Sequence, residues 1–395
     1  MIDFLKNAGE IFSELVDMRR YLHRHPETGR ALPETNRYIK QKLTEFGCQY
    51  DEISEGILTV VLGQGDRCVL VRADTDALPT RELSELPFAS QNGNSHSCGH
   101  DIHTASMLGA IKLLKPHERE LSGRIKFLLQ SDEERMLGAK AAIEAGVLEN
   151  PRVEAAIGMH TAIGLKTGLF NVDAGGYLAS SDAFRITVHG SAAHGSMPER
   201  GVDPIMIGAK ILLEAQTITS RLINALYPVV ITFGTFNAGD TFNIIPDTAA
   251  MTGTIRAFDP VARRRVKQLL ASIAEGVAGT YGGKAEFEMI SETPVVYNDP
   301  AMTERLLGYA RELLGVDGVR RGSLMLKASD DFAYYTERVP GVMYHIGMGT
   351  EADGCRYALH NPRVVFREEA MVQAAACYAY LPMRYLEQRG KEDNT

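Results

Sequence analysis

Hydrophobic and polar positions change their spacing several times within the first 180 residues. Short continuous apolar runs are typical of buried strands, and apolar residues three or four apart are typical of helices. Alternating strands and helices of this kind predict an α/β layer structure. The strands are expected at residues 57–62, 68–71, 125–129 and 155–159, and the helices at 11–46 (interrupted near Pro26), 103–114 and 138–145.

The pattern changes near residue 181. The elements expected there are a strand at 184–188, a helix at 204–223, strands at 229–236 and 249–257, a helix at 260–281 and a strand at 285–290. This βαββαβ order predicts a compact α+β unit with helices on one face of its sheet. Helix and strand pieces resume after Pro294, so the unit looks like an insertion. We therefore divide the chain into residues 1–180, 181–293 and 294–395.

Composition narrows the class of protein without naming a substrate. The 395 residues are 45% hydrophobic and 23% charged, and this length favours two domains. A net charge of −8 argues against a nucleic-acid partner. No run approaches the roughly 18 apolar residues that span a bilayer, and the first residues lack the pattern of a secretory signal. The five scattered cysteines do not resemble a disulfide framework, so we expect a cytoplasmic protein.

The run Cys98-Gly99-His100-Asp101-Ile102-His103 places four potential metal ligands within six residues, at the start of a helix. Thiolate and imidazole together suit zinc and other first-row divalent ions. Residues two apart on an extended loop can point into one site. A buried thiol beside helix-capping polar residues would account for the same run.

The run Asp132-Glu133-Glu134 directly follows the apolar residues 125–129. Ligands and catalytic groups gather at the carboxyl ends of strands in open α/β sheets. Of two adjacent carboxylates, one can bind a metal and the other can act as general base. A solvated acidic turn is the competing interpretation.

Two further histidines, His160 and His360, complete the candidate set. His160 follows the apolar run 155–159, and His360 lies far along the chain in Ala358-Leu359-His360-Asn361-Pro362. Either histidine alone is more typical of a core residue than of a ligand. The prediction of a metal site depends on all four pieces occurring together at strand ends or loops.

These motifs resemble the M20 metallopeptidase family, in particular the branch with aminoacylases, hippurate hydrolases, auxin-conjugate hydrolases and N-acetyl-diaminopimelate deacetylases. The resemblance spans nearly the whole chain, with motifs in the expected order. The supporting segments are Arg19-Arg20-Tyr21-Leu22-His23, Arg72-Ala73-Asp74-Thr75-Asp76-Ala77-Leu78-Pro79, Ala192-Ala193-His194-Gly195, Asn243-Ile244-Ile245-Pro246-Asp247, Gly253-Thr254-Ile255-Arg256 and Ser329-Asp330-Asp331-Phe332.

The resemblance implies a mixed-sheet α/β catalytic domain with helices on both faces, interrupted by an α+β lid domain that mediates homodimerisation. It implies two divalent metals per subunit, zinc or manganese, with cobalt or nickel also chemically suitable. Glu133 would be the general base. Asp74 is left out of the ligand set, because this branch replaces the wider family's histidine there with the Cys98 region. The implied metal ligands are Cys98, His100, Glu134, His160 and His360.

Three residues of the inserted unit would serve the substrate if the resemblance holds. His194 would reach across the dimer and polarise the scissile carbonyl, and Asn243 would assist at that oxygen. Arg256 would pair with the substrate carboxylate, which a guanidinium binds in bidentate fashion. Without the resemblance, His194 is typical of a turn in a loop rich in small residues.

The expected activity is hydrolysis of the amide bond of small N-acyl amino acids by a metal-activated water. A dipeptidase or carboxypeptidase with the same site, a single-metal hydrolase and a non-catalytic binding protein on this fold are the alternatives. Two departures from the branch leave the substrate open. The chain has Gln130-Ser131-Asp132 where Gln-Pro-Ala is common, and Ser-Asp-Asp-Phe where Ser-Glu-Asp-Phe is common.

Overall fold

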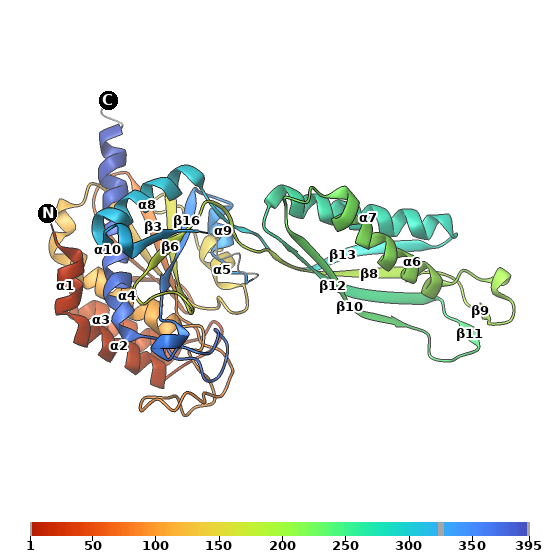
Figure 1. Cartoon of the computed structure of the whole chain (residues 1–395), viewed down its shortest axis with the longest axis horizontal. Helices are drawn as coiled ribbons and strands as arrows, with labels where there is room; N and C mark the ends of the chain where they lie inside the picture. Colours follow the sequence, from red (N-terminus) through yellow and green to blue (C-terminus); the bar gives the residue numbers. More distant parts are fainter. Residues whose placement is uncertain (1, 323–327, 393–395) are drawn as a thin grey trace. The chain divides into compact units, whose positions relative to one another are not determined.

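The computed structural model describes residues 2–322 and 328–392, which fall into two compact units (Figure 1). Of these residues, unit 1 comprises 2–175, 297–322 and 330–392. Unit 2 comprises 176–296 and 328–329. Among the described residues, no helix combines the length and apolar character needed to cross a bilayer.

Unit 1 is built on an eight-stranded mixed sheet with the strand order β1-β2-β4-β3-β5-β16-β6-β15. The neighbouring pairs β4–β3, β3–β5 and β5–β16 are parallel. The pairs β1–β2, β2–β4 and β16–β6 are antiparallel. The strands are β1 (Asp51–Ser54), β2 (Ile57–Gly63), β3 (Cys68–Asp74), β4 (Arg124–Gln130), β5 (Ala155–Ala162), β6 (Phe170–Val172), β15 (Val319–Arg321) and β16 (Gly341–Gly347).

Helices lie on both sides of this sheet, with α4 and α10 on one side and α5 and α9 on the other (Figure 1). Alternate strand residues such as Val69, Val71 and Ala73 enter the main apolar core with residues of α4 and α10. The intervening positions of a strand point to the opposite face, so Arg72 and Asp74 face away from that core. The helices are α1 (Phe4–Glu10), α2 (Phe12–Arg24), α3 (Pro33–Glu45), α4 (His100–Leu114), α5 (Gly138–Glu144), α8 (Pro300–Leu314), α9 (Ala333–Thr336) and α10 (Met371–Glu392).

Unit 2 contains a four-stranded antiparallel sheet with the order β10-β12-β8-β13. Helices α6 and α7 cover one face of it (Figure 1), where alternate β8 residues Phe184, Ile186 and Val188 are buried. The order along the chain is βαββαβ, so the predicted fold class is confirmed. The elements are β8 (Ser181–His189), β9 (Ala193–His194), α6 (Pro204–Thr217), β10 (Val229–Ala238), β11 (Ile244–Ile245), β12 (Thr248–Ala257), α7 (Pro260–Thr280) and β13 (Lys284–Thr293). β7 (Gly175–Leu178) and β14 (Val296–Asn298), at the two ends of this segment, pair in a separate two-stranded sheet.

Three helices begin with the same Asp-Pro signal. Asp203, Asp259 and Asp299 precede the first prolines of α6, α7 and α8, and each side chain accepts a hydrogen bond from a backbone N–H of the first turn. A carboxylate satisfies an otherwise unpaired N–H there, and proline fits the first helical position because it needs no donor. The sequence therefore specifies the starts of these helices locally.

Candidate metal centre

The carboxyl ends of three parallel strands of unit 1 bring the candidate residues to one edge of the sheet. β3 ends at Asp74, β4 ends at Gln130 just before Glu133, and His160 lies near the end of β5. α4 begins there at His100, after Gly99 in a left-handed conformation with φ 90°. This conformation favours glycine, and it turns the chain sharply between Cys98 and the helix.

Cys98, Glu134 and His360 lie together although the last is 262 residues from the first. The Cys98 Sγ lies 3.3 Å from His360 Nε2 and 3.5 Å from His160 Nε2. The His360 Nε2 also lies 3.6 Å from Glu134 Oε1. One ligand atom from each of Cys98, Glu134 and His360 falls within 4.8 Å of the others, which is compatible with a common cation.

Two of the histidines are oriented by their second ring nitrogen. His100 Nδ1 lies 2.8 Å from the backbone oxygen of Asp76, and His160 Nδ1 lies 2.8 Å from that of Thr161. A carbonyl oxygen only accepts, so both Nδ1 atoms donate, which leaves each Nε2 as the ring nitrogen that could bind a metal. His100 Nε2 lies 3.9 Å from Glu134 Oε1. Both atoms are buried without a hydrogen-bond partner among the described residues, and a divalent cation would satisfy them.

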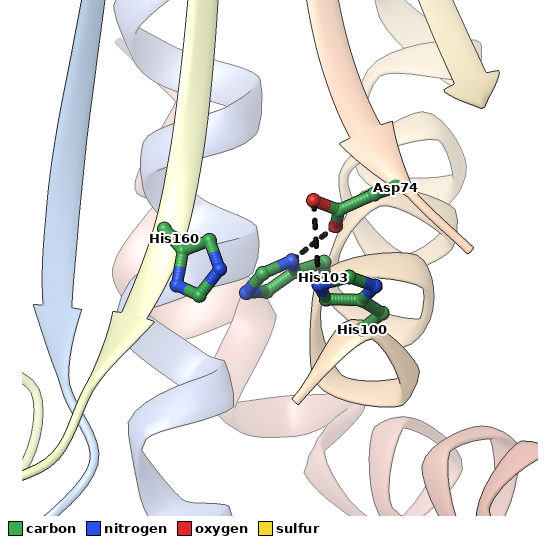
Figure 2. Close-up of side chains that lie close together, drawn as sticks. All are labelled: Asp74, His100, His103 and His160. Carbon is green, nitrogen blue, oxygen red and sulfur yellow. Dashed lines mark hydrogen bonds and ion pairs between the residues drawn. The ribbon is translucent and has the colours of Figure 1, made fainter. Parts of the chain in front are cut away.

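His103 and Asp74 lie beside these candidate ligands and hydrogen-bond each other, and Asp74 Oδ2 also lies 3.6 Å from His100 Nε2 (Figure 2). His103 Nδ1 hydrogen-bonds Asp74, and its Nε2 accepts from the Thr161 N–H at 2.9 Å. Asp74 also forms an ion pair with the buried Arg72 at 2.6 Å. Both nitrogens of His103 are therefore occupied, which places it beside the metal centre as a structural neighbour. Asp101, the other potential ligand of the motif, pairs with Arg19 and His23 instead.

Glu133 is buried next to Glu134 and is held through its backbone. The Asp76 carboxylate accepts hydrogen bonds from the N–H groups of Glu133 at 3.1 Å and Glu134 at 3.2 Å. Burial raises the pKa of the Glu133 carboxyl well above its usual range, and the nearby carboxylates of Asp330 and Glu134 raise it further. A raised pKa suits a general base, because it brings proton affinity closer to neutral pH.

Burial and the Glu134 carboxylate also raise the pKa of the Cys98 thiol well above its usual range. A bound divalent cation acts in the opposite direction, because it stabilises the thiolate that coordinates it. The donor set of one thiolate, imidazoles and a carboxylate, converging from separate segments, fits first-row divalent metals better than magnesium.

The remaining candidates, His194, Asn243 and Arg256, all belong to unit 2. β9 and β11 pair so that His194 lies opposite Ile244. The Gly195 N–H donates to the backbone oxygen of Asn243 at 2.9 Å. His194 and Asn243 are thus neighbours, and both are exposed. Arg256 lies near the carboxyl end of the ten-residue strand β12. There it donates a hydrogen bond to Ser329 Oγ at 2.7 Å.

Sequence reasoning missed the groups that hold the ligands in place. Asp76 and Asp330 appeared in recognised motifs, but their contacts with the Glu133 backbone and with Arg72 could not be read from spacing. Asp330, at one of the two departures from the branch, lies with Asp331 within 4.8 Å of Glu133. This departure therefore lies next to the candidate base.

Comparison with known proteins places this centre in a family. Residues 70–384 match the sequence model of Peptidase family M20/M25/M40. The chain belongs to this family. It is similar to the N-acetylcysteine deacetylase of Bacillus subtilis strain 168, with 36% identity over 381 residues that cover 95% of this chain and 97% of the relative.

Two further comparisons bear on activity and metal. Thermostable carboxypeptidase 2 of Saccharolobus solfataricus is 33% identical over 395 residues, covering 98% of this chain and 99% of its own length. The crystal structure of a dinuclear metal-binding M20 peptidase from Bacillus subtilis superimposes with a TM-score of 0.82 and 33% identity, covering 96% of this chain and 99% of that one. The predicted family is confirmed.

Proposed function

We propose that this M20 protein hydrolyses the amide bond of small N-acyl amino acids, such as N-acetyl or N-benzoyl amino acids. The observation that carries this proposal is the buried Glu133 beside converging ligand atoms of Cys98, His100 and Glu134. The similarity to an N-acetylcysteine deacetylase supports the acyl-amino acid class. A non-catalytic binding protein has no need of a buried base next to a ligand carboxylate.

The proposed metal ligands are Cys98, His100, Glu134, His160 and His360. When bound, two divalent cations would polarise the amide carbonyl and lower the pKa of water from about 15.7 to about 7. We propose that both ions are zinc or both are manganese, and cobalt or nickel would also suit these donors. The cofactor assignment draws support from the similar dinuclear M20 structure.

Glu133 performs the proton transfers in this mechanism. Its carboxylate takes a proton from the water that attacks the amide carbonyl, and then delivers this proton to the leaving nitrogen. The Asp76 side chain helps to hold Glu133 in place, because it accepts hydrogen bonds from the backbone N–H groups of Glu133 and Glu134. His194 and Asn243 would stabilise the developing oxyanion with preorganised donors, and Arg256 would hold the substrate carboxylate.

We further propose that the protein works as a homodimer through unit 2, with the partner subunit's His194 completing each site. Among the described residues, the outer strand β10 pairs on one side only, with β12. Such an edge invites pairing with another chain. Unit 2 also exposes several large apolar side chains to solvent, and a second copy would cover them. They include Leu213, Leu222, Leu226, Val230, Phe236, Phe242 and Ile244.

The dimer proposal is tested by mixing two inactive variants. In a mixed dimer of Glu133→Gln and His194→Ala subunits, one site regains both intact residues only if His194 acts across the dimer. Co-expressed and co-purified mixed dimers should recover activity that neither variant has alone. Absence of recovery in verified mixed dimers would place His194 in its own subunit's site.

A carboxypeptidase or dipeptidase activity at the same centre is the second candidate, favoured by the similarity to thermostable carboxypeptidase 2. A panel of acetyl-, benzoyl- and aminoacyl-amino acids, assayed with each divalent metal in turn, separates the candidates. Preference for acetyl or benzoyl substrates supports the proposal, and preference for aminoacyl substrates favours a peptidase.

The five free, buried cysteines support a reducing cytoplasm as the compartment.

A further inference from the structure

A largely buried ionic cluster lies next to the metal centre and has no part in the proposed chemistry. Its members are Arg19, Arg20, His23, Glu82, Asp101 and Glu368. His23 lies between two carboxylates, with Nδ1 2.8 Å from Asp101 and Nε2 3.0 Å from Glu82. Both ring nitrogens must donate, so His23 is charged and the cluster balances three cations with three carboxylates.

Arg19 is the centre of this cluster. Its side chain is 1% exposed, its Nε donates to Asp101 Oδ2 at 2.9 Å, and its Nη1 donates to Glu368 Oε1 at 2.9 Å. A guanidinium presents several donors in a rigid planar fork, so one side chain can fix two carboxylates at a set separation.

The two carboxylates that Arg19 joins belong to two segments that carry candidate ligands. Asp101 directly follows His100 in the first turn of α4. Glu368 ends the segment that begins at His360 and opens a short 3-10 turn. The same segments also meet through the backbone, where the His360 N–H donates to the Ser97 oxygen at 2.9 Å.

We propose that Arg19 is a positioning residue that sets the spacing between Cys98 and His360, and with it the affinity of the site for metal. This inference rests on the proposed ligand set. It does not depend on which substrate is cleaved. Residues beyond the ligands that orient metal sites in this way commonly change affinity by about 10–100-fold when replaced.

Arg20 provides a matched control. It donates to the same Glu368 carboxylate at 2.6 and 3.1 Å, and its guanidinium lies over Phe88 at 4.7 Å, as that of Arg19 does at 5.0 Å. Its side chain is 40% exposed, and among the described residues its hydrogen bonds go to Glu368 and leave Asp101 untouched. Replacing Arg20 therefore disturbs Glu368 without breaking the bridge.

The experiment measures Co²⁺ binding by the full-length protein and its Arg19→Lys, Glu368→Met and Arg20→Met variants. Cobalt bound to Cys98 has a sulfur-to-cobalt charge-transfer absorption that depends on ligand geometry, so it reports position as well as affinity. Thermal unfolding in the presence of a chelator establishes that each variant is folded. Lysine keeps the charge of Arg19 but lacks the fork that holds two carboxylates.

Arg19→Lys and Glu368→Met, which lacks the acceptor for Arg19, should weaken Co²⁺ binding by about 10–100-fold and alter the charge-transfer absorption. Arg20→Met should bind and absorb like the wild type. A folded Arg19→Lys protein with wild-type affinity and absorption would overturn the proposal. If Arg19→Lys does not fold, unchanged binding by a folded Glu368→Met protein would overturn it equally. Because Co²⁺ binding is measured without substrate, a failure of the proposed hydrolysis is read separately.

Discussion

The metal centre of unit 1 and the His194–Asn243 region of unit 2 hold their candidate residues in opposite ways. In the metal centre, His100 and His160 are buried, and a hydrogen bond to the backbone fixes each ring. His194 and Asn243 are exposed, and His194 contacts Ser196 within its own loop. The first region is preorganised within unit 1, whereas the exposed candidate residues of unit 2 are not fixed by burial.

The largest expected effect comes from removing a proposed metal ligand of the preorganised region. Glu134→Ala should lose bound metal and reduce amidohydrolase activity to background, because the carboxylate lies near both His100 and His360. Elemental analysis of the purified protein and an N-acyl amino acid assay measure the two effects. Glu144→Ala, an exposed acid in α5, is the control and should change neither. Normal metal content in the Glu134 variant would remove this residue from the ligand set.

Glu133→Gln should separate binding from catalysis within the same region. The amide keeps the shape of the side chain but cannot take a proton, so turnover should fall roughly 10²–10⁴-fold while metal content stays unchanged. Near-normal turnover would show that another group is the base.

His194→Ala tests the exposed region. Loss of one oxyanion donor should lower kcat by about 10²–10³-fold, with metal content unchanged because His194 belongs to unit 2. His189→Ala, a partly exposed histidine at the end of β8, is the matched control and should stay close to wild type. Loss of metal from the His194 variant would instead indicate a ligand role, and full activity would indicate a simple turn residue.

The smallest expected effect is a pH dependence of stability in the ionic cluster beside the metal centre. Burial opposes the charge on His23, but the carboxylates of Asp101 and Glu82 outweigh it and raise the pKa of the imidazole. A pKa raised in the folded state adds stability that is complete below the unfolded value near 6.5 and is lost as pH rises through the folded value.

The free energy of unfolding of wild type and of His23→Gln, measured by denaturant titration across pH, checks this expectation. The advantage of the wild type should be greatest at mildly acidic pH and shrink as pH increases. An advantage that is constant or grows with pH would mean that His23 is neutral in the folded protein.

The comparison of regions also explains what the sequence could predict. Apolar runs located β2, β3, β4 and β5 and the four-stranded sheet of unit 2, and Asp-Pro pairs mark three helix starts, because these signals are local. The short strands β1, β6 and β15 were not predicted. The helix expected from residue 103 begins at His100, since the left-handed Gly99 rather than an apolar period determines its start. The two-residue strands β9 and β11 have no detectable period, so the pairing beside His194 was not predicted.

The candidate site was predictable as a set of residues but not as an arrangement. Motifs identified Cys98 and His360 separately, whereas their 3.3 Å approach depends on how the whole of unit 1 folds. The residues that orient these two side chains are also far from one another in the sequence, as the ion pair between Arg19 and Glu368 illustrates. Such contacts between remote segments leave no pattern in a single sequence.

The most direct test of the proposed activity is a metal titration of chelator-treated protein, followed by hydrolysis of an N-acyl amino acid. Chelation should abolish the release of free amino acid, and added zinc or manganese should restore it, reaching a plateau at two metal ions per subunit. Hydrolysis that survives complete metal removal, or fully metal-loaded protein that releases no amino acid, would contradict the account.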